Sequence, residues 1–217
     1  MARLKARKKR AALPLVRRML RAQNVRWHAS TSLEADDIIR SIPEASRRVI
    51  VASADLSSAQ IQPRDMEPHS PPIRFVFVSR VSPKKNLDLA ISALAFVTTE
   101  AILDVYGPIE DKSYWARCEE RIASLPSNIT VTYRGELPPN DVPAAFARYD
   151  AFVFPTRGEN FGHVIAESLA ASCPVICSDL TPWTPVLETG GGTVVRELIP
   201  AAFGEVLARW PPGHRPS

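Results

Sequence analysis

The stretch Thr156-Arg-Gly-Glu-Asn-Phe-Gly-His-Val-Ile-Ala-Glu167 follows the apolar run Ala151-Phe-Val-Phe-Pro155. This order predicts a buried strand, a tight turn and a helix that starts at Phe161-Gly162. A helix start presents unpaired backbone N–H groups and the positive end of the helix dipole, which suits a phosphate. The carboxylates of Glu159 and Glu167 flank this point and can accept hydrogen bonds from hydroxyls on either side of the anion. The implied ligand is a diphosphate between two polyols, which describes a nucleotide sugar.

The chain after Ile73 alternates between strand and helix signals. Short apolar strands that alternate with helices predict an α/β fold, with a doubly wound, Rossmann-like parallel sheet covered on both faces. The expected strands are 73–79, 101–106, 129–133, 151–154, 174–178 and 193–195, and the expected helices are 86–97, 112–125, 140–148, 161–171 and 197–209. Ligands of such sheets bind at the carboxyl ends of the strands. The residues expected at that edge are Arg80, Gly107, Arg134, Glu136, Pro155 and Asp179.

Further motifs accompany the opening stretch along the chain. They are Phe77-Val-Ser-Arg80-Val-Ser-Pro-Lys-Lys85-Asn86, Val105-Tyr-Gly-Pro-Ile-Glu-Asp111, Tyr133-Arg-Gly-Glu136, and Cys173-Pro-Val-Ile-Cys-Ser-Asp179 with Thr181-Pro-Trp183. Together with Glu159-x7-Glu167 they resemble the donor-binding C-terminal lobe of the retaining, GT-B-type glycosyltransferases of family 4. The resemblance implies transfer of a sugar from a UDP-, GDP- or ADP-sugar to a glycan or lipid acceptor. The alternative is a truncated module that binds nucleotide sugar without turnover and needs a partner lobe or subunit.

The resemblance assigns roles to four charged residues. Arg80 and Lys85 match the family's arginine and lysine that contact the donor pyrophosphate and stabilise the departing nucleotide, so no metal or other cofactor is expected. An exposed basic loop is the plain alternative, and Lys84 leaves the choice of lysine open. Glu159 is expected to accept hydrogen bonds from the donor sugar, and Glu167 from the ribose.

The turn before the helix and the end of the third strand complete the implied donor site. Backbone groups from Phe161 to His163 are expected to meet the distal phosphate, and a side chain at Gly162 is expected to fill the space of that anion. Arg134-Gly-Glu136 either edges a nucleobase pocket or forms a plain turn. Trp183 is expected to pack in the core, with the rim of the sugar pocket as the alternative. The residues implied to bind the donor are Arg134, Gly135, Glu136, Asn160, Phe161, Gly162, His163, Val164 and Glu167.

Two expectations concern the ends and faces of helix 161–171. The family usually has glycine where Ser172 stands, so Ser172 is expected to adopt a left-handed conformation. Glu167 is expected to point away from the core. The residues expected on the buried face are Phe161, Val164, Ile165 and Leu169.

The charge of the chain is concentrated at its N-terminal end. Residues 1–26 hold ten Lys or Arg and no acidic residue, so the formal net charge of +4 divides into +10 there and −6 elsewhere. A solvated helix face is the favoured interpretation, peripheral contact with a membrane comes second, and nucleic acid is not expected because no aromatic residue interleaves the basic ones. Three cysteines without a CxxC pair, no apolar span and no signal peptide predict a cytoplasmic protein with buried thiols.

The 217 residues are fewer than a two-lobe GT-B enzyme needs. Residues 1–61 are expected to be the end of an acceptor lobe, 62–72 a proline-rich linker, 73–209 the nucleotide-sugar-binding domain and 210–217 a tail. Within the first part we expect a basic helix over 1–25, a short strand and turn over 25–31, a helix over 32–41 capped by Ser32, and a strand over 49–51.

Overall fold

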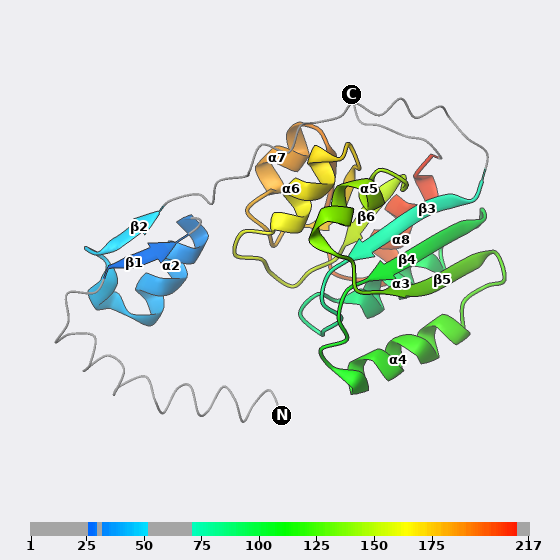
Figure 1. The fold of residues 1–217 in the computed structure, drawn as a ribbon, viewed down its shortest axis with the longest axis horizontal. Helices are drawn as coiled ribbons and strands as arrows, with labels where there is room; N and C mark the ends of the chain where they lie inside the picture. Colours follow the sequence, from blue (N-terminus) through cyan, green and yellow to red (C-terminus); the bar gives the residue numbers. More distant parts are fainter. Residues whose placement is uncertain (1–25, 30–31, 52–70, 212–217) are drawn as a thin grey trace. The chain divides into compact units, whose positions relative to one another are not determined.

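The computed structural model describes residues 26–29, 32–51 and 71–211. The chain divides into two compact units, Met1–Asp55 and Leu56–Ser217 (Figure 1). The helix expected over residues 1–25 lies outside the described residues, as does all of the expected linker except its last two residues.

The described part of the first unit is a small βαβ arrangement. Strands β1 (Trp27–Ala29) and β2 (Val49–Val51) pair in parallel, and helix α2 (Ser32–Ser41) and the short 3-10 helix η1 (Pro43–Ala45) connect them. The two strands and the helix confirm the predicted elements. Helix α2 begins at Ser32 itself, the residue expected as its cap.

Unit 2 contains one parallel sheet in the part that the structure describes. The strand order is β5-β4-β3-β6-β7-β8, so the chain winds outward from β3 in one direction and then returns to wind outward from β6 in the other. This order confirms the predicted doubly wound, Rossmann-like sheet. The strands are β3 (Ile73–Val78), β4 (Ala101–Tyr106), β5 (Ile129–Gly135), β6 (Ala151–Phe154), β7 (Val175–Ser178) and β8 (Gly192–Val195).

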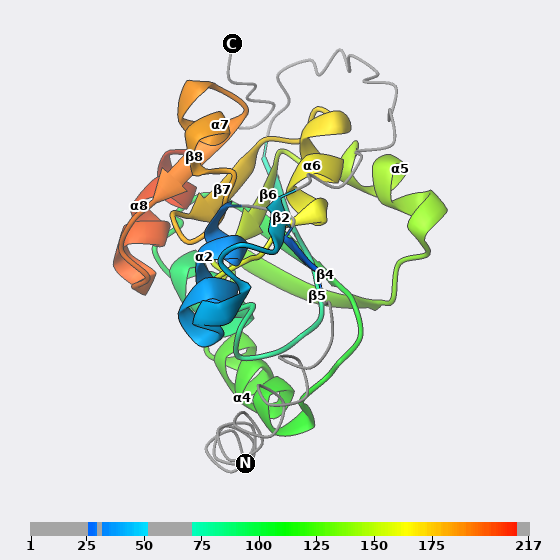
Figure 2. The same ribbon diagram turned by 90° about the vertical axis from the view of Figure 1, so that its left-hand side faces the viewer.

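Helices cover both faces of this sheet (Figure 2). Helix α3 packs against α4 and α8 on one face, and α5 packs against α6 on the other. The faces differ because right-handed crossovers that leave β3 and β6 in opposite directions place their helices on opposite sides of the sheet. The helices of unit 2 are α3 (Leu87–Leu94), α4 (Lys112–Ala123), η2 (Pro139–Asp141), α5 (Val142–Phe146), α6 (His163–Ala170), α7 (Thr184–Thr189) and α8 (Pro200–Arg209).

The core lies around the central strands, where side chains on both sheet faces are buried. Every residue of β6 and β7 is buried, whereas the edge strand β5 exposes several of its residues. Phe152 stacks on Phe154 and meets Phe146 edge to face. The loops that leave β3 and β6 therefore start from the most firmly packed part of the sheet.

The structure differs from the expected elements in three local details. Helix α3 starts at Leu87 because Asn86 has a φ of 62°, outside the helical range. Helix α6 starts at His163 rather than at residue 161, because Gly162 is left-handed with a φ of 77°. Helix α7 was not expected, since six residues are too few for a helical periodicity to show in the sequence.

Two further expectations are confirmed. Ser172 has a φ of 55° at the end of α6, the left-handed conformation that usually selects glycine. All three cysteines are buried. Burial raises the pKa of the Cys118 and Cys177 thiols to about 12, which leaves both thiols protonated at neutral pH.

Candidate functional site

The candidate site lies where two loops leave the carboxyl ends of the adjacent strands β3 and β6. The loop after β3 covers residues 79–86 and the loop after β6 covers residues 155–162. Because the chain winds away from β3 and β6 in opposite directions, this is the switch point of the sheet, where doubly wound folds bind their ligands.

Main-chain and side-chain hydrogen bonds join these two loops. The Arg157 N–H donates to the Lys84 carbonyl at 2.9 Å. The Arg157 guanidinium donates to Asn86 Oδ1 from Nε at 3.1 Å and from Nη2 at 2.9 Å. Asn86 is 1% exposed, and among the described residues its Nδ2 has no hydrogen-bond partner. The two loops are therefore held in register by contacts that the sequence did not indicate.

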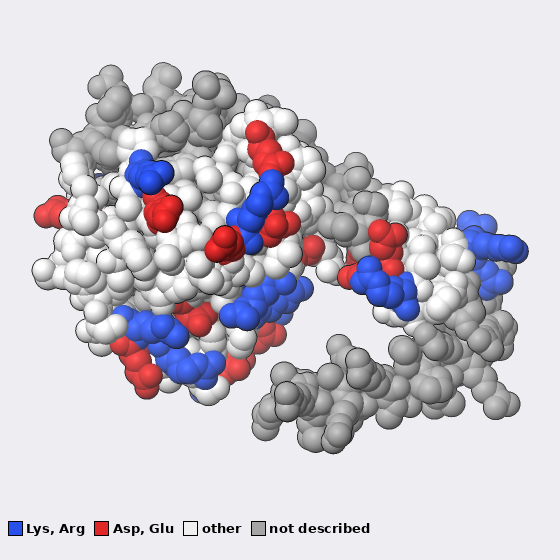
Figure 3. All heavy atoms as spheres, turned by 180° about the vertical axis from the view of Figure 1, so that it is seen from behind, with Lys and Arg blue, Asp and Glu red and all other residues white. Residues whose placement is uncertain are grey.

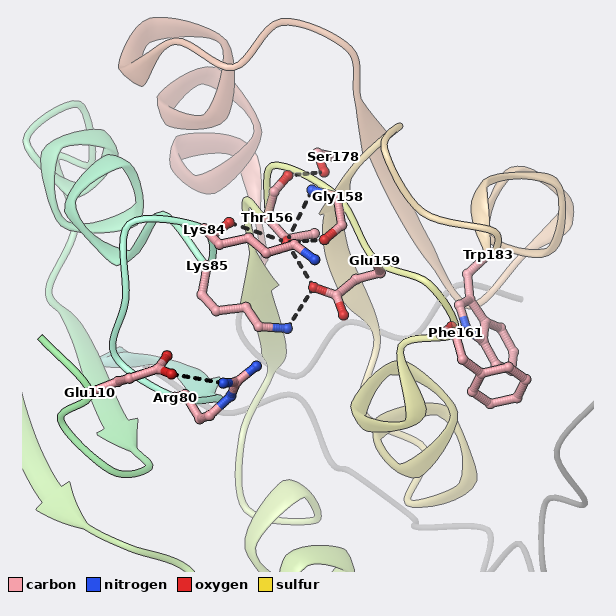
Figure 4. Close-up of polar contacts among 10 residues, drawn as sticks. All are labelled: Arg80, Lys84, Lys85, Glu110, Thr156, Gly158, Glu159, Phe161, Ser178 and Trp183. Atoms are coloured by element: carbon pink, nitrogen blue, oxygen red, sulfur yellow. Dashed lines mark hydrogen bonds and ion pairs between the residues drawn. The ribbon is translucent and has the colours of Figure 1, made fainter. Parts of the chain in front are cut away.

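Lys85 and Glu159 form a buried ion pair at the centre of the site (Figure 4). Lys85 Nζ lies 2.6 Å from Glu159 Oε1, and each side chain is 10% exposed. The Thr156 hydroxyl donates to the same oxygen at 2.8 Å, and the ammonium lies over the Phe154 ring at 5.2 Å from its centroid. Little water reaches the pair, so each charge depends strongly on the other. Lys84, the other candidate lysine, is exposed.

The loop after β6 is further fixed by hydroxyl groups beneath it. Ser178, the last residue of β7, donates from its hydroxyl to the Thr156 carbonyl at 2.6 Å. The Gly158 N–H donates to Thr156 Oγ1 at 3.3 Å, within the turn that leads to Glu159. Thr156 and Ser178 are both fully buried. These small polar residues give no distinctive sequence signal, and sequence analysis did not identify them.

Arg80 lies in the loop after β3, away from the Lys85–Glu159 pair. Its Nη1 is 3.0 Å from Glu110 Oε1, and the two side chains are 57% and 51% exposed. An ion pair that is this exposed contributes little to stability, so a stronger anion can replace Glu110 at low cost. Figure 4 shows the side chains of Arg80 and Lys85 extending toward the same side, where α6 begins.

The start of α6 faces this site with a glycine turn. Phe161 is half-buried, and its ring lies 4.3 Å from the ring of His163, which is exposed. A Cβ at Gly162 would lie 3.2 Å from Ile165 Cδ1 and 3.5 Å from two atoms of the Trp183 indole. A side chain at Gly162 would thus meet Ile165 and Trp183, and it would also need a left-handed backbone, which L-residues rarely adopt. That such a side chain would fill the anion space stays a prediction.

Helix α6 buries fewer of the expected residues than the periodicity suggested. Ile165 is buried as expected and Glu167 is exposed. Val164 and Leu169 are half-buried, whereas Ala166 and Ser168 are buried. Phe161 is not a helical residue, since the helix begins two residues after it. Asn160, the remaining residue expected in this turn, is exposed.

Arg134, Gly135 and Glu136 lie at the end of β5, two strands away from β3. Arg134 belongs to the strand itself, and its Nε is 2.9 Å from Asp104 Oδ1 on β4. This carboxylate raises the pKa of the guanidinium and also accepts a hydrogen bond from the Tyr149 hydroxyl at 2.8 Å. Gly135 has a φ of 81°, and a Cβ there would meet nothing within 4 Å. Glu136 is exposed.

The described ranges 26–29, 32–51 and 71–211 contain neither a candidate metal cluster nor a membrane span. No group of three or more His, Cys, Asp or Glu side chains there could hold a metal ion. No helix there is long and apolar enough to cross a membrane. On the face of unit 2 in Figure 3, basic and acidic side chains alternate rather than forming a continuous basic surface.

Comparison with known proteins adds a family match. The model of the family "Glycosyl transferases group 1" matches residues 60–210. The chain is 27% identical over 122 residues to O-antigen chain mannosyltransferase B of Escherichia coli. It is 26% identical over 129 residues to phosphatidyl-myo-inositol mannosyltransferase of Mycobacterium leprae. These alignments cover 54% and 58% of this chain but only 31% and 32% of the two relatives, so the chain spans about a third of their length.

Solved structures match over most of the chain. WaaG, a glycosyltransferase involved in lipopolysaccharide biosynthesis, matches with a TM-score of 0.70 and 19% identity, over 86% of this chain and 54% of WaaG. Anabaena Alr3699/HepE in complex with UDP and glucose matches with a TM-score of 0.73 and 18% identity, over 91% of this chain and 56% of that chain. At this level of identity the likeness shows the fold, which is that of GT-B glycosyltransferases.

Proposed function

Because the chain belongs to the glycosyl transferases group 1 family, we propose that it transfers a sugar from a nucleoside diphosphate sugar to a glycan or lipid acceptor, with retention at the anomeric carbon. The curated relatives named above are mannosyltransferases, and the Anabaena protein was solved with UDP and glucose. The observation that carries the proposal is the buried Lys85–Glu159 pair at the switch point of the sheet. The activity, acceptor and partners of the whole protein are part of the proposal.

In the proposed reaction the bond between the anomeric carbon and the distal phosphate oxygen breaks, and the nucleoside diphosphate leaves with the electron pair. The acceptor hydroxyl forms the new bond on the same face of the sugar, and its proton passes to the departing phosphate. Lys85, Arg80 and the backbone N–H groups at the start of α6 stabilise the negative charge that develops on the leaving group. This positive surface supports a transfer that needs no bound metal ion.

The two carboxylates have separate roles in this proposal. Among the described residues, both contacts of the Glu159 carboxylate use Oε1, so Oε2 can accept hydrogen bonds from the donor sugar. Glu167 is exposed on α6 and accepts from the ribose hydroxyls. Arg134, Gly135 and Glu136 border the nucleobase, with Asp104 holding the guanidinium of Arg134 in place.

The protein would act close to a membrane surface. An acceptor that is a lipid or a lipid-linked glycan would be reached at the cytoplasmic face of a membrane. The ten basic residues of the segment 1–26 would be attracted to the anionic lipids of that surface.

Binding of a nucleoside diphosphate is the first test. The 217-residue chain should release or absorb heat on titration with at least one of UDP, GDP and ADP, because Lys85 and the start of α6 are in place without a ligand. Inorganic phosphate serves as a control that offers charge without a nucleoside. The proposal would be contradicted if a cooperatively folded chain gave no binding heat with any of the three.

Substitution of each carboxylate should separate the two proposed roles. Glu167→Ala should weaken UDP and UDP-glucose alike, or GDP and GDP-mannose alike, by about 1–3 kcal/mol for a lost charged hydrogen bond. Glu159→Ala should weaken the sugar nucleotide relative to the free diphosphate, because the sugar loses an acceptor while Lys85 no longer has a carboxylate competing for it. Calorimetric titration with both ligands gives the ratio of the affinity for the sugar nucleotide to the affinity for the free diphosphate. Equal losses on both ligands in both variants would refute the assignment.

A further inference from the structure

Trp183 makes a specific hydrogen bond to the turn that opens α6. It is the residue directly before α7, in the loop that follows β7. Its indole Nε1 donates to the Phe161 carbonyl at 2.7 Å (Figure 4). The two rings meet edge to face, with centroids 6.1 Å apart and planes at 84°. Packing alone, the role that the sequence favours, needs the ring but not this hydrogen bond.

A hydrogen bond on the Phe161 carbonyl fixes the next amide group as well. The peptide between Phe161 and Gly162 is planar and trans, so its C=O and N–H point in opposite directions. Holding the carbonyl toward Trp183 therefore turns the Gly162 N–H away from it. Gly162 has no Cβ and tolerates many backbone conformations, so its own φ and ψ preferences do not set this direction. The indole supplies the constraint that glycine lacks.

The same loop holds the turn at a second point. The Glu159 N–H donates to the Leu180 carbonyl at 3.1 Å, so two bonds from the loop after β7 bracket Asn160. Trp183 is itself anchored, because the Leu187 N–H donates to its carbonyl at 2.9 Å as α7 begins. The loop after β7 thus holds in place the residues that connect Glu159 to α6.

We propose that Trp183 is a positioning residue for the distal phosphate of the donor. Its indole N–H fixes the Phe161–Gly162 peptide, and with it the direction of the N–H groups at the start of α6. This inference rests on the proposed function, because it assumes that a diphosphate binds there. It predicts that Trp183 affects the recognition of the distal phosphate and not that of the nucleoside or the first phosphate.

Trp183→Phe keeps an aromatic ring and removes the N–H donor. We expect it to weaken whichever of UDP, GDP and ADP binds the parent protein by about tenfold, the scale of one lost hydrogen bond. The corresponding monophosphate should keep its affinity to within about twofold, so the ratio of diphosphate to monophosphate affinity falls. A role in packing alone would lower the thermal midpoint without changing this ratio.

Trp210→Phe is the matched control. The Trp210 indole also donates to a backbone carbonyl, that of Asp150 at 3.3 Å. Asp150 directly precedes β6, so this bond lies at the amino ends of the strands and away from the candidate site. This variant should lower the thermal midpoint and leave the affinity ratio unchanged. An unchanged ratio in Trp183→Phe, or an equal loss of both ligands, overturns the role of Trp183 while the proposed function stands. If the parent protein bound no nucleoside diphosphate, both the role of Trp183 and the proposed function would be contradicted.

A second measurement covers the case in which Trp183→Phe does not fold. The chain has four tryptophans, so the indole N–H resonance of Trp183 in ¹⁵N-labelled protein can be assigned by eliminating the other three with single Phe variants. This resonance should shift on addition of the diphosphate and remain in place with the monophosphate. Absence of a shift with a diphosphate that binds, or equal shifts with both ligands, would overturn the proposal.

Discussion

Lys85→Met is expected to lower the affinity for nucleoside diphosphate by roughly a hundredfold or more. Loss of one partner from a buried charge interaction costs about 3–5 kcal/mol, and every 1.4 kcal/mol is about a tenfold change in affinity. Methionine keeps an unbranched side chain and removes the ammonium, which lies over the Phe154 ring. Calorimetric titration of the parent and the variant with the same nucleotide measures the loss.

Two controls separate binding from folding in this experiment. Lys84→Met removes the neighbouring exposed lysine and should leave the affinity within about threefold, since a surface charge near the site contributes little. Lys85→Met leaves Glu159 buried without its partner, so the double variant Lys85→Met/Glu159→Gln should recover thermal stability without recovering binding. Full affinity in a folded Lys85→Met protein would show that the wrong lysine has been assigned.

Gly107→Ala should destabilise unit 2 more than any other glycine substitution at the site edge. Gly107 follows β4 with a φ of 128°, and a Cβ there would lie 2.1 Å from the Ser79 carbonyl oxygen and 2.6 Å from its carbon. These are main-chain atoms of the neighbouring loop and cannot move aside singly. Backbone strain and overpacking together should lower the free energy of unfolding by about 3 kcal/mol or more. Urea denaturation monitored by circular dichroism measures this change.

Gly135→Ala provides the comparison, because the Gly107 N–H donates to the Gly135 carbonyl at 2.8 Å and both glycines have positive φ. A Cβ at Gly135 would point into open space, so only the left-handed backbone should cost free energy, about 1–2 kcal/mol. If the two variants lost equal stability, the close approach to Ser79 would not be the reason for glycine at position 107.

The architecture of unit 2 could be predicted because its signals are local. Runs such as Ala151–Phe154 are apolar, short and separated by helical segments, and this alternation is enough to predict a parallel sheet. Both loops of the candidate site follow such runs, so Lys85 and Glu159 could be placed at the carboxyl ends of the strands from the strand positions alone. Their direct pairing could not, because it depends on β3 and β6 being neighbours, and 74 residues separate the two side chains.

The details that sequence analysis missed depend on directions that only the folded backbone defines. The direction of a Cβ at Gly162 follows from its φ, so the sequence did not indicate that it would meet Ile165 and Trp183. Arg157 reaches Asn86 across the same strand junction, and Trp183 reaches Phe161 from a third loop. Each contact joins segments that are distant in the chain, and no spacing within either segment indicates it.

The ion pair between Lys85 and Glu159 affects how the nucleoside diphosphate product of the proposed reaction would leave the site. When a free nucleoside diphosphate binds the Lys85 ammonium, the buried Glu159 carboxylate loses its partner. When a donor binds, its sugar hydroxyls can donate hydrogen bonds to Glu159 at the same time. Once the sugar has been transferred, that compensation is gone and Glu159 competes to take Lys85 back. In the proposed reaction Glu159 therefore competes with the product for Lys85, which favours product release over product inhibition.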